Sequence, residues 1–176
     1  MRMLQLKLDF VHEQDRLLLR VSTDNQQEVR LWLTRRAVRL LWPLLVNMVR
    51  SSPEVARQSN PEARDALVGI QHEQALRRAD FATPFEETER EMPLGAEPIL
   101  VVRLQAGKDD KGNQVLGLLP QQGQGINLTL DNTLLHSLCQ LVQNAVAKSD
   151  WDMVLELPAL QTPLALDEAA APRTIN

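Results

Sequence analysis

The feature that most constrains this chain is a pattern that occurs twice, about a hundred residues apart. In residues 29–34 and again in residues 126–131, apolar and polar side chains alternate, as they do in a half-buried strand. Each stretch leads directly into a segment in which apolar residues recur every three or four positions, which is typical of a helix that packs on one side. The matching helical positions are Val38, Leu41 and Leu45 in the first copy and Leu135, Leu138 and Val142 in the second. This correspondence indicates a duplicated unit.

Two more strands precede each of these strand-to-helix pairs. Alternating segments at 4–10 and 17–21 precede the first copy, and segments at 100–104 and 115–119 precede the second. We therefore predict an α+β fold made of two duplicated β-meander-plus-helix units (βββα twice) with a mostly antiparallel sheet. A further alternating run at 151–157 predicts a possible seventh strand.

Polar residues with a capping side chain stand at the start of both predicted helices. Thr34 precedes the first helix, and Asp131 or Asn132 precedes the second. Such side chains accept a hydrogen bond from an unpaired amide of the first helical turn. We expect the first helix to end near Arg50 and the second near Lys148.

The chain divides into four parts on this reading. Residues 1–50 form the first unit, 51–98 a linker, 99–158 the second unit with its extra strand, and 159–176 a flexible tail, with the two units sharing one compact body. The linker is predicted to hold one charged helix, from Pro61 to about residue 79, and an exposed, mobile acidic loop at 86–91. The apolar face expected for that helix consists of Ala63, Ala66, Leu67 and Ile70.

The composition is that of a water-soluble globular protein, with 44% hydrophobic and 24% charged residues. The longest apolar stretch, 37–49, is short and contains Arg39, so it does not read as a membrane span. The first residues alternate like a strand and lack the apolar core of a signal peptide. A single cysteine, Cys139, cannot form an internal disulfide. The sequence therefore predicts a cytoplasmic protein with no membrane partner.

Charge is unevenly distributed. Residues 1–50 carry nine Lys and Arg against five Asp and Glu, whereas residues 51–92 carry five against nine. One group of basic residues gathers where the third strand enters the first helix, and a helix start favours anions. That group, Arg30, Arg35, Arg36 and Arg39, is a candidate anion-binding site. The scarcity of aromatic residues argues against nucleic acid, and pairing of these arginines with acidic residues of the linker or the second unit is the alternative.

The first predicted helix is apolar over more than one face. Besides the side that repeats the second helix, four further apolar residues lie beyond its two edges: Leu40, Trp42, Val46 and Val49. A helix this apolar must be covered on two sides, either by the linker helix or by a second copy of the chain. These four residues are the candidate interface of a homodimer.

The residues that could carry out chemistry are few. Cys139 and His136 have helical spacing, but Cys139 falls at the edge of the apolar face and His136 on the side expected to face water, which favours a buried, inert cysteine. The three histidines lie in unrelated segments, so no metal site is predicted. Gly123 and Gly125 fit a turn better than a phosphate loop, and residues 109–113 fit a hairpin better than a calcium loop.

The sequence thus predicts a non-enzymatic cytosolic protein-interaction module, adaptor or chaperone-like, that acts as a homodimer and binds an unidentified protein without a cofactor. Two alternatives remain open. One is an anion or nucleic-acid binder that uses the arginine group. The other is a small-ligand binder or enzyme with a pocket between the two units.

Overall fold

The computed structural model describes residues 3–159 and shows a mixed α+β protein with two sheets. The elements, in chain order, are β1 (Met3–Val11), the short 3-10 helix η1 (His12–Gln14), β2 (Arg16–Thr23), β3 (Glu28–Thr34), α1 (Arg35–Arg50), α2 (Pro53–Ala56), α3 (Pro61–Arg78), β4 (Ile99–Leu100), β5 (Arg103–Lys108), β6 (Gln114–Leu119), β7 (Ile126–Leu130) and α4 (Asn132–Ala147). The predicted α+β class is confirmed.

The two sheets have the orders β1-β2-β3-β4 and β5-β6-β7. All neighbouring strands are antiparallel except β3 and β4, which are parallel. The strand predicted around 100–104 is split between the sheets. The Val101 amide donates to the Trp32 carbonyl at 3.0 Å, and the next amide, of Val102, donates to the Leu119 carbonyl at 2.9 Å. The chain therefore crosses from one sheet to the other at this point, with Val101 buried between them.

Helices α1 and α4 begin where the sequence predicts. The Thr34 hydroxyl accepts from the Ala37 amide at 3.1 Å, and the Asp131 carboxylate accepts from the Leu134 amide at 2.8 Å. Each cap satisfies one of the unpaired amides at its helix start.

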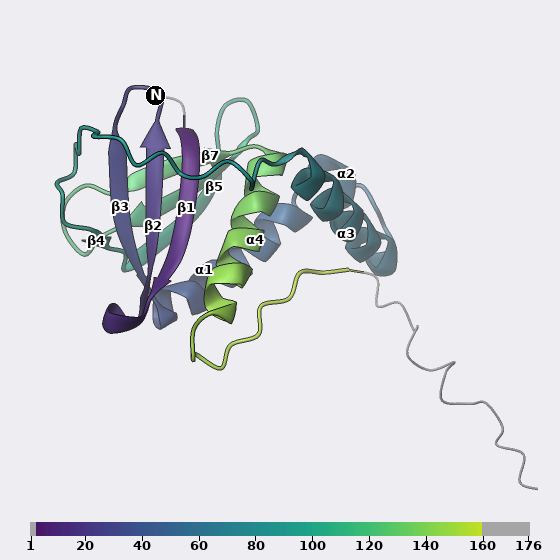
Figure 1. Cartoon of the computed structure of the whole chain (residues 1–176). Helices are drawn as coiled ribbons and strands as arrows, with labels where there is room; N and C mark the ends of the chain where they lie inside the picture. Colours follow the sequence, from purple (N-terminus) through teal and green to yellow (C-terminus); the bar gives the residue numbers. More distant parts are fainter. Residues whose placement is uncertain (1–2, 160–176) are drawn as a thin grey trace, which may run out of the picture.

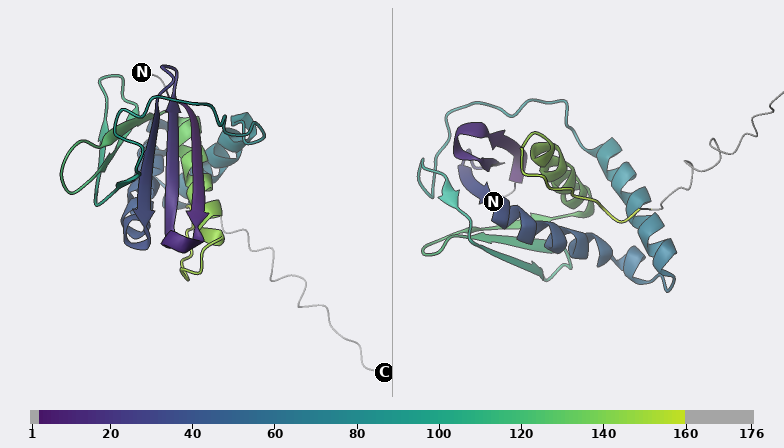
Figure 2. Two further views of the ribbon diagram at one scale, coloured as in Figure 1. Left: turned by 60° about the vertical axis from the view of Figure 1, so that its left-hand side comes forward. Right: turned by 90° about the horizontal axis from the view of Figure 1, so that it is seen from below.

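Both helices lie against the two sheets and against each other (Figures 1 and 2). α1 contacts β3, which precedes it, but also β5; α4 contacts β7, which precedes it, but also β1. Each helix therefore packs on strands from both halves of the chain, and a single hydrophobic core results. Within the described part of the chain, no helix is long and apolar enough to cross a membrane.

The segment after α4 is extended but forms no strand, so the seventh strand predicted at 151–157 is wrong. Its polar groups bond to side chains instead. The Leu155 carbonyl accepts from the Gln143 amide group at 2.8 Å, and the Glu156 carbonyl accepts from the Trp42 indole at 3.2 Å. Trp151 is buried with its ring against Phe10 of β1, and Met153, Leu155 and Leu157 are partly buried against the core. Alternation alone does not distinguish such packing from pairing in a sheet.

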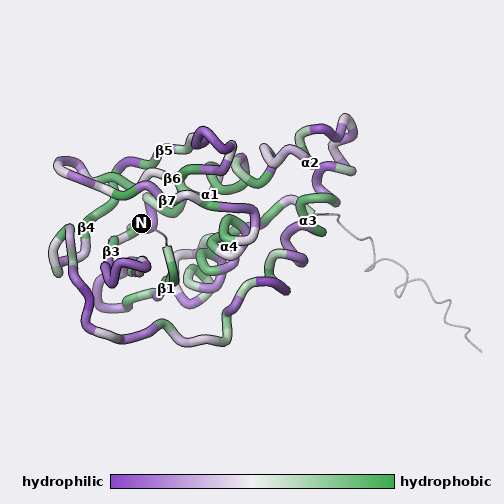
Figure 3. The backbone as a smooth tube through the Cα atoms, turned by 90° about the horizontal axis from the view of Figure 1, so that it is seen from above, coloured by the Kyte–Doolittle hydropathy of each residue, from purple (hydrophilic) through white to green (hydrophobic). Residues whose placement is uncertain are grey.

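The linker holds two helices, α2 and α3, where the sequence predicts one. α3 buries Val68, Gln71 and Ala75, whereas Ile70, expected on its apolar face, is exposed. The residues after α3, 79–91, are called the strap here because they cross the ends of β1 to β3 (Figure 1). Although residues 86–91 are hydrophilic (Figure 3), the strap is fastened to the sheet through two backbone hydrogen bonds of Glu91, to Gln26 and Glu28.

Candidate binding groove

A groove of about 890 Å³ lies between the two halves of the chain. One side is formed by β1 and parts of β2, the other by β7 and the first turns of α4, and strap residues 79–85 close a third side. The volume is within the range of small-molecule and cofactor sites. Its apolar lining includes Leu4, Leu6, Phe81, Leu128, Leu134 and Leu141.

Both strands that border the groove are edge strands. Among the strands that the structure describes, β1 pairs only with β2, and β7 only with β6. An edge strand presents backbone groups without a strand partner, which can pair with another chain. Two large apolar side chains stand at the groove with much of their surface in water, Leu4 at 59% and Phe81 at 45% exposure. The groove thus combines apolar surface with unpaired strand edges.

The polar lining of the groove has an acidic excess. Lys7 is its one basic residue, and it forms ion pairs with Asp9 at 3.3 Å and with Glu87 at 3.6 Å. Asp80 and Asp131 add two more carboxylates. Hydrogen bonds from Thr83 lower the pKa of Asp80, so this carboxyl is ionised at neutral pH.

One polar side chain of the groove is buried without a partner. Thr23, at the end of β2, is 3% exposed, and its hydroxyl oxygen makes no hydrogen bond within residues 3–159. A buried hydroxyl without a partner costs stability. This hydroxyl is therefore available to a polar group that enters the groove.

A buried carboxylate fastens the strap to the sheet beside the groove. Glu28 is 1% exposed and accepts from Arg20 at 2.8 Å and from Arg30 at 2.7 Å. Burial alone would raise its pKa, but the hydrogen bonds from the two arginines lower the pKa of Glu28 to about 2. Arg20 also donates to Glu87 of the strap at 2.7 Å, and its guanidinium lies over the Phe85 ring at 4.5 Å.

The arginine group predicted for anion binding is only partly available. Arg30 donates to Glu28, as described above. Arg35, Arg36 and Arg39 are exposed at the start of α1 and take part in no ion pair within the described residues. The expectation that these arginines pair with the linker is wrong for these three; the acidic strap pairs with Arg20 instead, because β2 lies beneath it.

The apolar surplus of α1 is mostly covered by the same chain. Val49 is fully buried, and Trp42 is 8% exposed, with its indole bonded to Glu156. Val46 is half-buried, and Leu40 is 51% exposed. Of the four residues proposed as an interface, Leu40 is thus the one that is fully on the surface.

The predicted burial of the candidate nucleophile is confirmed. Cys139 is fully buried, and burial raises the pKa of its thiol to about 12. The prediction for His136 is wrong, because its ring is fully buried rather than facing water and meets His72, 64 residues away. No group of three or more potential metal ligands occurs among the described residues.

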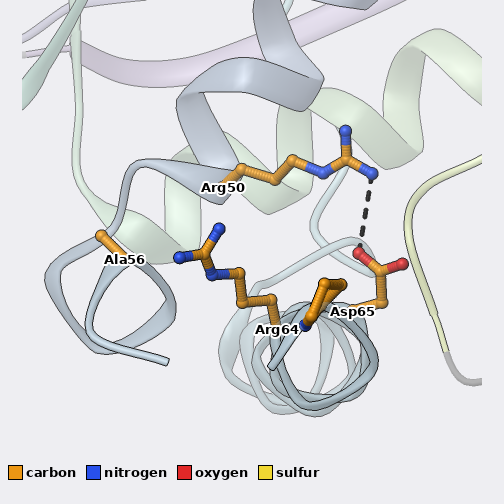
Figure 4. Close-up of a pocket in the computed structure, with 5 residues that line it drawn as sticks. Arg50, Ala56, Arg64 and Asp65 are labelled. Carbon is orange, nitrogen blue, oxygen red and sulfur yellow. Dashed lines mark ion pairs between the residues drawn. The ribbon is translucent and has the colours of Figure 1, made fainter. Parts of the chain in front are cut away.

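A smaller hollow, of about 390 Å³, lies where α1 ends and α3 begins (Figure 4). Its two guanidinium groups are already engaged. Arg50 forms an ion pair with Asp65 at 3.6 Å, and Arg64 donates to the Gln58 carbonyl. With a carboxylate in place beside Arg50, this hollow is a poorer binding site than the groove.

No protein-family model, curated protein or solved structure matches this chain.

Proposed function

We propose that this protein is a non-enzymatic protein-interaction module that holds an extended, apolar segment of a partner protein in the groove, alongside β1. The observation that carries the proposal is the groove itself, which lies between two edge strands and exposes Leu4 and Phe81. An extended segment that joins a sheet edge gains affinity from its backbone and specificity from alternate side chains. The acidic excess of the lining favours a segment with a Lys or Arg next to its apolar residues.

The test is selection of 12-residue peptides from a random display library against the whole chain. We expect the selected peptides to alternate apolar residues and to carry a basic residue. The variant Leu4→Asp should bind them at least 10-fold more weakly, because it places a charge at the groove. Leu100→Asp is the matched control, since Leu100 is also an exposed strand leucine but does not line the groove. Equal binding by wild type and Leu4→Asp, or failure to enrich any peptide, would contradict the proposal.

A small apolar ligand is the second candidate for the same groove, favoured by the unpartnered Thr23 hydroxyl. Such a ligand would place its polar end at Thr23 and its apolar body against the leucines. Native mass spectrometry of the purified protein distinguishes the two candidates. A constant added mass that disappears on denaturation would support the small ligand, and the bare chain mass would support the peptide.

An anion or nucleic-acid binder is a weaker proposal, because Glu28 already neutralises one of the four arginines. Retention on heparin that weakens steeply with salt would support it, and the triple variant Arg35→Gln/Arg36→Gln/Arg39→Gln should then elute early.

The internal duplication is also a proposal. The order of strands and the capped helices after Thr34 and Asp131 support it. Superposition of 29–48 on 126–145 tests it, because a duplicated unit should bring the strand and the helix into register together.

A further inference from the structure

A half-buried histidine, His72, meets the buried His136 where α3 packs on α4, beside the groove. The Nδ1 atoms of His72 and His136 are 3.2 Å apart, and His136 is fully buried. His136 precedes Ser137, which lines the groove, and α3 leads directly into the strap. The contact therefore joins α4, which forms one side of the groove, to α3, which continues into the residues that close another side.

The hydrogen bonds around the pair determine which nitrogen atoms carry protons. The Gln140 amide nitrogen donates to Asn144 at 2.8 Å, so its oxygen faces His72 Nε2, 3.3 Å away. His72 Nε2 therefore carries the proton, and His72 Nδ1 accepts from the Nδ1–H group of His136. The remaining nitrogen, His136 Nε2, is buried without a partner within the described residues. With both rings neutral, each N–H group of the pair has an acceptor.

Protonation is unfavourable in this geometry. One added proton leaves a single N–H group between the two Nδ1 atoms but puts a proton on His136 Nε2, and a second would place two N–H groups and two charges against each other. A proton on His136 Nε2 would bury a charge without an acceptor. Burial, followed by the charge of His72, lowers the pKa of His136 to about 4, and burial also lowers the pKa of His72.

The charged groups near the pair offer little compensation. Glu73 on α3 favours the protonated form of His72, but Glu73 is exposed and forms an ion pair with Arg77 at 3.6 Å. From α2, Glu54 approaches Gln71, and from α1, Arg50 pairs with Asp65. On β1, which also packs on α4, Lys7 and Asp9 pair with each other.

Apart from the histidine contact, little apolar surface of α3 is fully buried. α3 fully buries only two apolar residues, Val68 and Ala75, together with the polar Gln71. A helix with so little buried apolar surface can open locally at a lower free energy than the core.

We propose that the His72–His136 contact is an acid-sensitive latch, which holds α3 on α4 near neutral pH and releases α3, together with the groove-lining residues 79–83 that follow it, when the histidines are protonated. The biological role of this latch rests on the proposed function, but the opening of α3 does not depend on any partner. His136 stabilises the closed form fully above its ordinary pKa of 6.5, and this stabilisation is lost as the pH falls toward 4. Acidification from pH 7 to pH 5 should therefore favour the open form by about 20-fold.

The test is amide hydrogen exchange of the full chain at pH 7 and pH 5, expressed as protection factors so that the intrinsic pH dependence cancels. Protection of α3 should fall by about 20-fold at pH 5, while protection of β2 and β3 should change much less. In His136→Leu, which fits an apolar environment and removes the buried imidazole, α3 should lose this pH dependence. His12→Gln is the matched control, because His12 is exposed and should leave the effect unchanged.

An equal fall in α3 protection in wild type and His136→Leu would overturn the latch. If His136→Leu does not fold, titration of the histidine ring carbons of the wild-type protein by NMR decides: a ring of His136 that titrates near pH 6.5 while α3 stays protected would also overturn it. Because exchange is measured on the free protein, failure of the latch leaves the groove proposal standing. Conversely, failure of peptide selection would refute the groove proposal and leave the latch standing.

Discussion

At the scale of single residues, Glu28 is a carboxylate that three arginines surround. It is buried, and it accepts from arginines on two strands while Arg90 of the strap approaches to 3.6 Å. A buried ion pair adds little net stability when formed, but removing one partner leaves the other charges uncompensated. Glu28 therefore holds β2, β3 and the strap in one arrangement.

We predict that Glu28→Gln lowers the free energy of unfolding by about 3 kcal/mol. Because the pKa of Glu28 is about 2, below its ordinary value of 4.5, its stabilisation is complete above about pH 4.5 and declines as the pH falls toward 2. The difference in stability between wild type and Glu28→Gln should shrink over that interval. Urea unfolding at several pH values measures it. Glu89→Gln, an exposed acid of the strap, is the control and should change stability by less than about 0.5 kcal/mol.

At the scale of elements, the extended segment 151–159 takes the place that a second chain could occupy on α1. Two tryptophans attach it to the rest of the molecule, its own Trp151 and Trp42 of α1. Trp151 donates to Asp15 at 2.6 Å and meets the Phe10 ring edge to face, and Trp42 of α1 donates to Glu156. These contacts explain why Trp42 is buried in one copy of the chain.

Trp42→Phe should loosen this segment while leaving the ring pocket filled. Loss of the hydrogen bond to the Glu156 carbonyl is expected to cost about 1 kcal/mol and to speed amide exchange in 151–159. Trp32→Phe is a suitable comparison, because the Trp32 indole makes no hydrogen bond within the described residues. If both variants had the same effect on exchange in 151–159, the attachment would not depend on the Trp42 bond.

At the scale of the whole molecule, self-association through α1 remains a proposal, but the residues available for it are fewer than the sequence indicated. Trp42 and Val49 are already buried in one chain, which leaves Leu40 and part of Val46. A dimer built on this face would therefore have a small apolar contact unless neighbouring polar residues contribute.

Two glutamate substitutions separate folding from association. Trp42→Glu should destabilise the chain by about 3 kcal/mol or more, because it buries a charge in place of a packed ring. Leu40→Glu should leave the fold intact and, if α1 forms a two-fold interface, shift a dimer to a monomer, because the same charge meets its own copy. Sedimentation equilibrium at micromolar concentration gives the mass of each. A wild-type mass equal to that of one chain at all concentrations would remove the homodimer proposal.

The sequence by itself determined the elements whose signals are local. Alternation and helical spacing predicted five of the longer strands and the helices α1, α3 and α4, and Thr34 and Asp131 marked the starts of α1 and α4, because a cap bonds within its own first turn. The sixth strand, β5, begins later than the predicted 100–104, because the chain crosses between the sheets there. The burial of Cys139 followed from its position on an apolar helix face.

Only the tertiary structure decided which faces meet. His72 and His136 are 64 residues apart, and Arg20 and Glu87 are 67 apart, so no spacing in the sequence predicts either contact. The groove exists because α1 and α4 each pack on strands from both halves, which brings β1 and β7 to opposite sides of one cavity. Local patterns indicate that a side chain will be buried, but the partner that buries it depends on how the elements pack, and many packings satisfy the same pattern.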